Sequence, residues 1–186
     1  MFIQTEDTPN PNTLKFIPGL TVLDKGSAEF DSLEMAKNSN LATILLKVQG
    51  VNRVFFGYDF ISVSKNDDFS WDVLKPSVLT GIMEHYSSGK PILEGETDNK
   101  NEISDDDNDT IRQIKELIDQ RVRPAVAMDG GDIVFCSFES GVVTLEMKGA
   151  CAGCPSSTAT LKMGIENMLK HYIPEVIEVK AAEMQY

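Results

Sequence analysis

The chain is divided by an acidic stretch through which no hydrophobic core can continue. Residues Glu94–Asp109 have the sequence EGETDNKNEISDDDND, with eight acidic and one basic side chain, and so carry −7 of the chain's net charge of −12. Their single aliphatic side chain cannot bury enough apolar surface to offset the entropy that ordering would cost. We therefore expect a flexible, self-repelling acidic linker at 94–109, which joins two small domains at 1–93 and 110–186.

Composition and the start of the chain limit the class of protein. The 186 residues are 41% hydrophobic and 25% charged, as in soluble globular proteins. No run approaches the roughly 18 apolar residues that span a bilayer, and the acidic charge disfavours binding of nucleic acid through a basic surface. The N-terminal sequence MFIQTEDTPNPNTLKF lacks the features of a secretory signal or a transit peptide. We expect no membrane or nucleic-acid partner and a cytoplasmic location, or the mitochondrial matrix if a presequence was removed before this numbering begins.

In the first half, runs rich in β-branched and aromatic residues alternate with turn signals and helical patterns. The run TPNPN separates two strands, and the turn GYD joins two more runs, which predicts a hairpin. The predicted strands are 2–5, 13–17, 51–56 and 60–65, and the predicted helices are 39–47 and 70–86. The apolar residues of the second helix recur at helical spacing. This buried stripe is expected to contain Val73, Leu74, Val78, Ile82 and Tyr86.

In the second half, an amphipathic helix is predicted at 110–126, because its apolar residues form one stripe. The stripe consists of Ile111, Ile114, Leu117, Ile118, Val122 and Ala125. Thr110 with Gln113 has the spacing of a capping box at the start of this helix. After the tight turn Asp129-Gly-Gly-Asp132 we expect a hairpin of strands at 133–138 and 142–147, a helix at 155–171 and a strand at 176–180. The fold class is therefore predicted to be α+β, with α-β-β-α-β order in the C-terminal domain.

Two of the three cysteines lie in the stretch GACAGCPSS, on the predicted loop before the last helix. Proline is favoured at the first helical position, so Pro155 there makes Cys154 the N-cap residue. Free backbone N–H groups and the positive end of the helix dipole then lie beside the sulfurs of Cys151 and Cys154. Such a setting favours the thiolate, the form that attacks disulfides and binds metals. The pair is therefore predicted to be reactive or metal-ligating.

Three roles fit this C-x-x-C pair: a dithiol redox pair, half of a zinc site, or half of an iron–sulfur site. A thioredoxin-like role needs the motif after the first strand of a βαβ unit, whereas this motif follows a predicted antiparallel hairpin. The usual aromatic residue before the first cysteine is also replaced by Gly149-Ala150. This context disfavours the redox role without excluding its chemistry.

A zinc site and an iron–sulfur site each need four ligands, so other side chains would have to supply the remaining two. Cys136 is expected to be a small buried hydrophobe in a strand, on the face of Val134 and Phe138. His85 and His171 are expected to be partly packed surface side chains of helices. Four ligands are reached if two chains meet about a two-fold axis and each contributes its C-x-x-C pair to one shared cluster.

The sequence around this pair resembles a known family. Residues 110–180 contain I-x-x-L-I-x-x-R-V-R-P, then MDGGDIVF, then VTLEMKGACAGCPSSTATLKMGIENMLKHYIPEV, and are similar to the C-terminal domain shared by NifU and the Nfu proteins. The stretches FIQTEDTPNPNTLKFIPG, VFFGYDFISVSK, WDVLKPSVL and IMEHYSSGKPI resemble the N-terminal domain of Nfu proteins. Both halves and their order agree with an Nfu-type protein.

The resemblance implies an iron–sulfur cluster scaffold or carrier that is not an enzyme and has no catalytic residue. It implies that Cys151 and Cys154 of two subunits bind a [4Fe-4S] cluster, with [2Fe-2S] as the other cluster type, and that the cluster passes to apo-proteins by ligand exchange. Cys136, which the motif does not require, is a candidate third thiolate during transfer. The implied partners are a second copy of the chain, recipient apo iron–sulfur proteins and upstream cluster-assembly proteins.

Two alternatives remain open on the residues alone. One is a dithiol–disulfide oxidoreductase that uses the same C-x-x-C, and the other is a zinc-linked dimer. The N-terminal half contains no cysteine. We expect it to recognise recipients or assembly partners, with the linker giving the cluster-bearing domain its reach.

Overall fold

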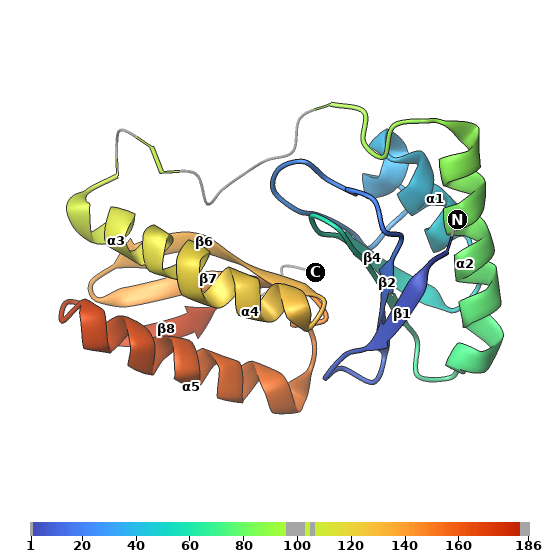
Figure 1. Ribbon diagram of the computed structural model, residues 1–186. Coiled ribbons are helices and arrows are strands. Elements are labelled where there is room, and N and C mark those ends of the chain that lie inside the picture. Colours follow the sequence, from blue (N-terminus) through green and yellow to red (C-terminus); the bar gives the residue numbers. More distant parts are fainter. Residues whose placement is uncertain (1, 96–102, 105–106, 183–186) are drawn as a thin grey trace. The chain divides into compact units, whose positions relative to one another are not determined.

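The computed structural model of the chain describes residues 2–95, 103–104 and 107–182, except for the side chains of 155–157. The chain divides into two compact units, Met1–Asp98 and Asn99–Tyr186, and each contains both helices and strands (Figure 1). The predicted α+β fold class is confirmed. Within the described residues, no helix has the length and apolar character needed to cross a membrane.

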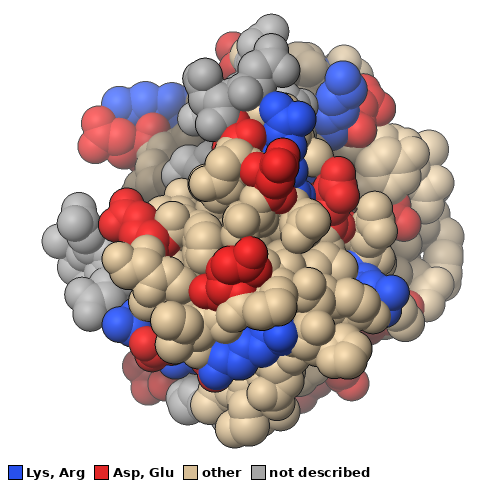
Figure 2. All heavy atoms as spheres, turned by 90° about the vertical axis from the view of Figure 1, so that its left-hand side faces the viewer, with Lys and Arg blue, Asp and Glu red and all other residues tan. Residues whose placement is uncertain are grey.

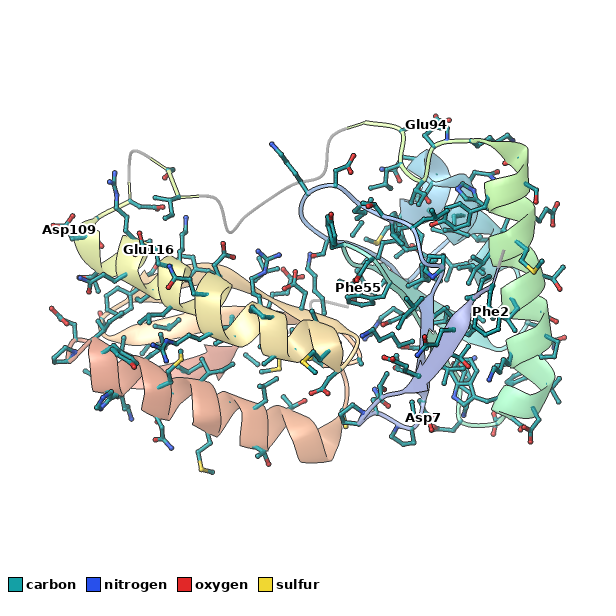
Figure 3. The ribbon with its side chains drawn as sticks, viewed as in Figure 1. Phe2, Asp7, Phe55, Glu94, Asp109 and Glu116 are labelled. Carbon is teal, nitrogen blue, oxygen red and sulfur yellow. The ribbon has the colours of Figure 1, made fainter. Side chains whose placement is uncertain are left out.

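The predicted linker at 94–109 lies largely outside the described residues. Its last residues belong to the C-terminal unit, since Asp109 begins a helix there (Figure 3). The Asn108 side chain accepts a 2.8 Å hydrogen bond from the Ile111 N–H, so Asn108 and not Thr110 is the N-cap. The predicted capping box of Thr110 and Gln113 is therefore wrong.

The N-terminal unit is built on an antiparallel sheet with the strand order β1-β2-β5-β4-β3. Its strands are β1 (Gln4–Asp7), β2 (Thr13–Ile17), β3 (Ala28–Phe30), β4 (Val51–Phe56) and β5 (Ile61–Lys65). β4 and β5 form the predicted hairpin, with Val54 opposite Val63. The sequence did not predict β3, which at 3 residues is too short to show alternation, or the short 3-10 helix η1 (Met35–Asn38).

Helices α1 (Asn40–Leu46) and α2 (Trp71–Ser88) cover one face of this sheet (Figure 1). Serine N-caps begin both helices: Ser39 accepts from the Ala42 N–H and Ser70 from the Asp72 N–H. The buried core between helices and sheet includes Leu14, Phe16, Leu41, Leu45, Val54, Phe56, Ile61, Val63, Val78 and Ile82. Val73 is 69% exposed, so its predicted place in the buried stripe is wrong.

The other face of the sheet carries a smaller aromatic group. Strand alternation turns Phe55 away from the core, and Figure 3 shows it on the side of the sheet opposite α2. Its ring centroid lies 5.8 Å from that of Phe60, and the Lys15 Nζ lies 4.9 Å from the Phe60 centroid. Both faces of the sheet therefore carry aromatic packing.

The C-terminal unit has the predicted α-β-β-α-β order. Its elements are α3 (Asp109–Leu117), the π-helical turn η2 (Ile118–Val122), α4 (Arg123–Met128), β6 (Gly131–Glu139), β7 (Val142–Gly149), α5 (Pro155–Tyr172) and β8 (Glu178–Ala181). The sheet order is β6-β7-β8, with β6 antiparallel and β8 parallel to β7. Its core includes Ile114, Ile118, Val122, Val126, Ile133, Phe135, Val143, Leu145, Cys151, Ile165 and Leu169.

The single helix predicted at 110–126 is divided by the π-helical turn η2. Pro124 has no N–H to donate to the carbonyl four residues earlier, and its ring clashes with that carbonyl in a regular α-helix. The wider π turn immediately before Pro124 accommodates this defect. The changed register leaves Ala125 exposed, although the sequence placed it on the apolar stripe.

Strand β6 contains a β-bulge at Cys136. The register of β6 against β7 shifts between Phe135 and Ser137, which makes Cys136 the extra residue. The bulge changes the alternation of sides, so that Phe135 and Phe138 both pack on the core while Cys136 is exposed. The prediction that Cys136 is buried on the face of Val134 and Phe138 is therefore wrong.

Candidate functional site

The C-x-x-C loop joins β7 to α5. Cys154 is the N-cap residue of α5, with extended backbone angles, and Pro155 occupies the first turn, as the sequence predicted. The orphan N–H groups of that turn and the positive end of an 18-residue helix therefore lie next to Cys154. This setting stabilises negative charge on sulfur, as a thiolate ligand requires.

Hydrogen bonds hold the loop in a tight curve. The Ala152 N–H donates to the Gly149 carbonyl at 3.1 Å, and Gly153 has a φ of +72°, which other residues adopt only with strain. Thr158, one turn into α5, donates its hydroxyl to the Cys154 carbonyl at 2.6 Å. Thr158 is thus a site residue that the sequence did not identify, because nothing in its spacing marks the carbonyl that it binds.

Both motif cysteines are buried, at 6% exposure for Cys151 and 3% for Cys154. Cys151 also belongs to the hydrophobic core of the C-terminal unit. Neither pairs in a disulfide, and the same holds for Cys136 within the part of the chain that the structure describes. Both thiols are therefore in the reduced form, and Cys151 is packed into the fold.

The Asp129–Asp132 turn packs directly against Cys151. A Cβ on Gly131 would lie 2.5 Å from the Cys151 Sγ and 2.8 Å from the Lys148 carbonyl oxygen, closer than real Cβ atoms approach. The neighbouring Gly130 carbonyl accepts a 3.1 Å hydrogen bond from the Ala150 N–H. The sequence predicted a tight turn here, but not that the second glycine makes room for the sulfur.

A charged network fixes the end of this turn. Arg123 donates from Nε to Asp132 Oδ1 at 2.8 Å and from Nη2 to Oδ2 at 3.1 Å, and from Nη1 to Asp119 at 2.7 Å. The Ile133 N–H also donates to Asp132 Oδ1, and Asp132 is 6% exposed. Burial lowers the pKa of Arg123, but the hydrogen bonds to Asp132 and Asp119 outweigh it, so the guanidinium stays charged.

The other candidate donors lie elsewhere. Over residues 2–95, 103–104 and 107–182, no group of three or more His, Cys, Asp or Glu side chains could hold a metal ion, so Cys136 does not join the pair. His171 is exposed on α5. His85 is 1% exposed, with its Nδ1 3.3 Å from the Asn40 amide, so the prediction of a surface histidine is wrong for His85. The described residues therefore place two cysteines on this loop and no further donor beside them, whereas a four-ligand site needs two more.

The topology around the C-x-x-C differs from the predicted one in a way that bears on a redox role. Because β8 lies parallel to β7, the segment β7-α5-β8 is a βαβ unit with the C-x-x-C at the start of its helix. The predicted antiparallel hairpin of β6 and β7 is present, but β7 also begins a parallel unit that was not predicted. The topology alone therefore does not separate thiol–disulfide exchange from cluster binding.

The surface gives no sign of a basic binding face on the side that Figure 2 draws. There, acidic and basic side chains are interspersed, and the basic side chains form no continuous patch. This mixed surface agrees with the net charge of −12.

Sequence comparison relates both halves to one family. Residues 3–89 match the family described as scaffold protein Nfu/NifU N terminal, and residues 114–180 match the NifU-like domain. The chain is 51% identical over 191 residues to NifU-like protein 4, mitochondrial, of Arabidopsis thaliana, covering 100% of this chain and 66% of that protein. It is 54% identical over 182 residues to NFU1 iron-sulfur cluster scaffold homolog, mitochondrial, of Drosophila persimilis, covering 97% of this chain and 64% of that protein.

The chain therefore spans 64–66% of the length of these two relatives. Among solved structures, the solution structure of a NifU-like protein from Saccharomyces cerevisiae is 25% identical, with a TM-score of 0.47, over 52% of this chain and 87% of that chain. The two domain matches follow each other in the order that the sequence resemblance implied. With both domains present, this chain belongs to the Nfu/NifU family.

Proposed function

We propose that this protein is an iron–sulfur cluster scaffold or carrier, which binds a [4Fe-4S] cluster between two subunits and transfers it to apo-proteins. The ligands are Cys151 and Cys154 of each subunit, and no residue acts as a catalyst. The names of the relatives support the scaffold role, since one is an iron-sulfur cluster scaffold homolog. The cluster is cargo that enters and leaves.

The observation that carries this proposal is the half-complete donor set. Two thiols lie on one tight loop at a helix N-terminus, and the described residues provide no third ligand beside them. A cubane cluster takes four thiolates, and a second copy of the same loop supplies the missing two. A site split between chains can open by separation of the subunits, which suits a protein that gives its cluster away.

Transfer is a ligand exchange without net electron transfer. Each recipient thiol loses its proton and binds an iron atom, and one donor thiolate leaves that iron and takes up a proton. After four such exchanges the donor chains are again dithiols and the recipient holds the cluster. The dipole at the α5 N-terminus stabilises the departing thiolate until it is protonated.

The remaining assignments are part of the same proposal. The cluster-binding domain is 110–186, and 1–93 is a partner-recognition domain connected to it through the acidic linker at 94–109. Recipient apo-proteins and upstream assembly proteins are the proposed partners. The relatives are named mitochondrial, so the predicted cytoplasmic location is one of two compartments to test.

The experiment is anaerobic reconstitution of the full chain with iron and sulfide, followed by iron and sulfide analysis and visible absorption. We expect a brown protein, with loss of bound cluster in Cys151→Ser and in Cys154→Ser. Cys136→Ser is the matched control, because that thiol is exposed and lies outside the pair. We expect it to hold as much cluster as the unmodified chain.

The same variants separate the alternatives. A colourless protein that reduces insulin disulfides, and loses this activity on substitution of either motif cysteine, would identify a dithiol oxidoreductase. A protein that retains about half a zinc ion per chain with four sulfur ligands would identify a zinc-linked dimer. A cluster held equally well by Cys151→Ser would contradict the proposal directly.

A further inference from the structure

We propose that Arg123 and Asp132 are positioning residues that hold the Asp129–Asp132 turn against Cys151 and thereby fix the sulfur of Cys151 for cluster binding. This inference rests on the proposed function, because it assigns two further residues to the same site. It extends the site from the C-x-x-C loop to the helix on the other side of the turn. Neither residue is a ligand.

The ion pair between Arg123 of α4 and Asp132 of β6, called the clamp below, joins these two elements firmly. Arg123 binds both carboxylate oxygens of Asp132, at 2.8 and 3.1 Å, which is the two-point geometry that orients both groups. Asp132 is almost fully buried, so this contact is shielded from water and salt. The Ile133 N–H also donates to the Asp132 carboxylate, at 2.8 Å. The start of β6 therefore has one well-defined position relative to α4.

The turn that carries Asp132 also contacts the Cys151 sulfur. Asp132 follows Gly131 directly, and the space over the Gly131 Cα is filled by the Cys151 Sγ and the Lys148 carbonyl. The Gly130 carbonyl accepts from the Ala150 N–H, so the turn also holds the residue before Cys151. A shift of the turn by a few tenths of an ångström would therefore move the Cys151 side chain.

The clamp acts on one cysteine of the pair. Cys154 is positioned from the other side, as the N-cap of α5, with its carbonyl bound by the Thr158 hydroxyl and N–H at 2.6 and 3.0 Å. These contacts do not involve the turn, although the Thr158 hydroxyl also donates to the Cys151 carbonyl at 3.4 Å. Loss of the clamp should therefore affect the Cys151 side chain more than Cys154, whereas general destabilisation of the unit would affect both cysteines alike.

The local backbone supports a positioning role. Arg123 is the residue at which the π turn η2 ends and α4 begins, next to Pro124. Such π turns inside helices are frequent at functional sites. Arg123 also reaches Asp119 at 2.7 Å, but that carboxylate is 52% exposed, so this second contact adds little. Arg123 therefore has two carboxylate partners, Asp132 and Asp119. Only Asp132 belongs to the turn that packs against Cys151, so Asp119 can serve as a control.

The test uses full-length chains with Arg123→Lys, Asp132→Asn and, as control, Asp119→Asn. Lysine keeps the charge of Arg123 but cannot bind a carboxylate with a planar fork. We expect Arg123→Lys and Asp132→Asn to lower cluster affinity about 10- to 100-fold, as the loss of outer-shell partners does at metal sites. Asp119→Asn should retain as much cluster as the unmodified chain.

A second readout does not depend on the cluster. The apo-proteins are treated with iodoacetamide, and the alkylation rate of each cysteine is followed by mass spectrometry. In Arg123→Lys and Asp132→Asn the rate at Cys151 should change several-fold, whereas the rates at Cys154 and at exposed Cys136 stay as in the unmodified chain. If Arg123→Lys fails to fold, the charge-free pair Arg123→Gln with Asp132→Asn is used, with the same expected change at Cys151.

The outcomes distinguish this inference from the proposed function. If the unmodified chain binds no cluster, the proposed function fails, and the alkylation rates still decide whether the clamp positions Cys151. If the variants hold as much cluster as the unmodified chain and Cys151 reacts at an unchanged rate, the inference is overturned while the proposed function stands. Equal changes at Cys151 and Cys154 would also overturn it, since they indicate general loosening.

Discussion

Among the described residues, the hydrophobic core of the N-terminal unit contains no cysteine, whereas the hydrophobic core of the C-terminal unit includes Cys151. Both units use the same means, a small antiparallel or mixed sheet covered by helices on one face. All three cysteines lie in the C-terminal unit. A core substitution should therefore change only stability in the first unit, but both stability and the proposed cluster site in the second.

Close packing over glycine illustrates the same difference. A Cβ on Gly57 in the N-terminal unit would lie 2.3 Å from the Phe60 ring, and one on Gly131 in the C-terminal unit would lie 2.5 Å from the Cys151 Sγ. Gly57 meets side-chain atoms alone, whereas Gly131 also meets the Lys148 carbonyl oxygen and the Cys151 backbone N. A methyl group would press on an aromatic ring at the first position and on a proposed ligand at the second, so comparing the two variants separates an effect on packing from an effect on cluster binding.

The largest effects should come from cavities in the two cores. Leu45 and Leu145 are both 0% exposed, one in each unit. We expect Leu45→Ala and Leu145→Ala each to lower the free energy of unfolding by about 2–5 kcal/mol in its own unit. Urea unfolding, with one probe in each unit, measures this. Only Leu145→Ala should also reduce cluster content. Equal losses of cluster in both variants would show that the two cores do not differ in their effect on the cluster site.

Crowding at the two glycines should give the next largest effect. Gly57→Ala and Gly131→Ala each overpack their site, at a cost of about 1–3 kcal/mol in the free energy of unfolding. Cluster content after reconstitution should fall in Gly131→Ala, because its methyl group displaces the Cys151 sulfur, and stay unchanged in Gly57→Ala. If Gly131→Ala binds cluster normally, the turn does not position the ligand.

Removal of one N-cap from each unit should give a smaller change. Asn108 caps α3 at 2.8 Å and Ser70 caps α2 at 3.2 Å. We expect Asn108→Ala and Ser70→Ala each to cost about 1 kcal/mol of unfolding free energy in its own unit. Thermal melts of the two variants check this. A C-terminal unit insensitive to Asn108→Ala would mean that α3 begins at another residue.

The smallest expected effect is a pH dependence of the N-terminal unit. Burial, and secondarily the charge of Lys90, lower the pKa of His85 below its ordinary value of 6.5. The unfolded chain therefore binds the proton first, so this contribution is complete above pH 6.5 and is lost as the pH falls through the lower folded pKa. The urea midpoint should fall between pH 7.5 and 5.5, and less so in His85→Gln. His171→Gln, which changes an exposed histidine, is the control. If the urea midpoint of His85→Gln falls with pH as steeply as that of the unmodified chain, His85 is not the source of the pH dependence.

The elements of the fold followed from local signals wherever those signals act within a few residues. Strand β2 and the start of α5 lie where the turn signal TPNPN and Pro155 predicted them, because these signals act locally. The bulge at Cys136 was not predictable, since it depends on the register against β7. The π turn could have been suspected from Pro124, which breaks a helical hydrogen bond in any register.

The sequence singled out Cys151 and Cys154 by their spacing, and the family resemblance implied that they are ligands, but the residues packed around them were not predicted. The contact of Gly131 with the sulfur and the clamp of Arg123 with Asp132 depend on how β6, β7 and α4 meet in space. The same holds for the parallel pairing of β7 with β8, which no local pattern encodes.

In the function proposed above, each chain supplies half of one cluster site. Native mass spectrometry of the anaerobically reconstituted full chain tests it most directly, because it counts chains and iron atoms in the same particle. We predict a particle of two chains with one [4Fe-4S] cluster, which falls to bare monomers in Cys151→Ser. A monomer that carries a complete four-iron cluster would contradict the account.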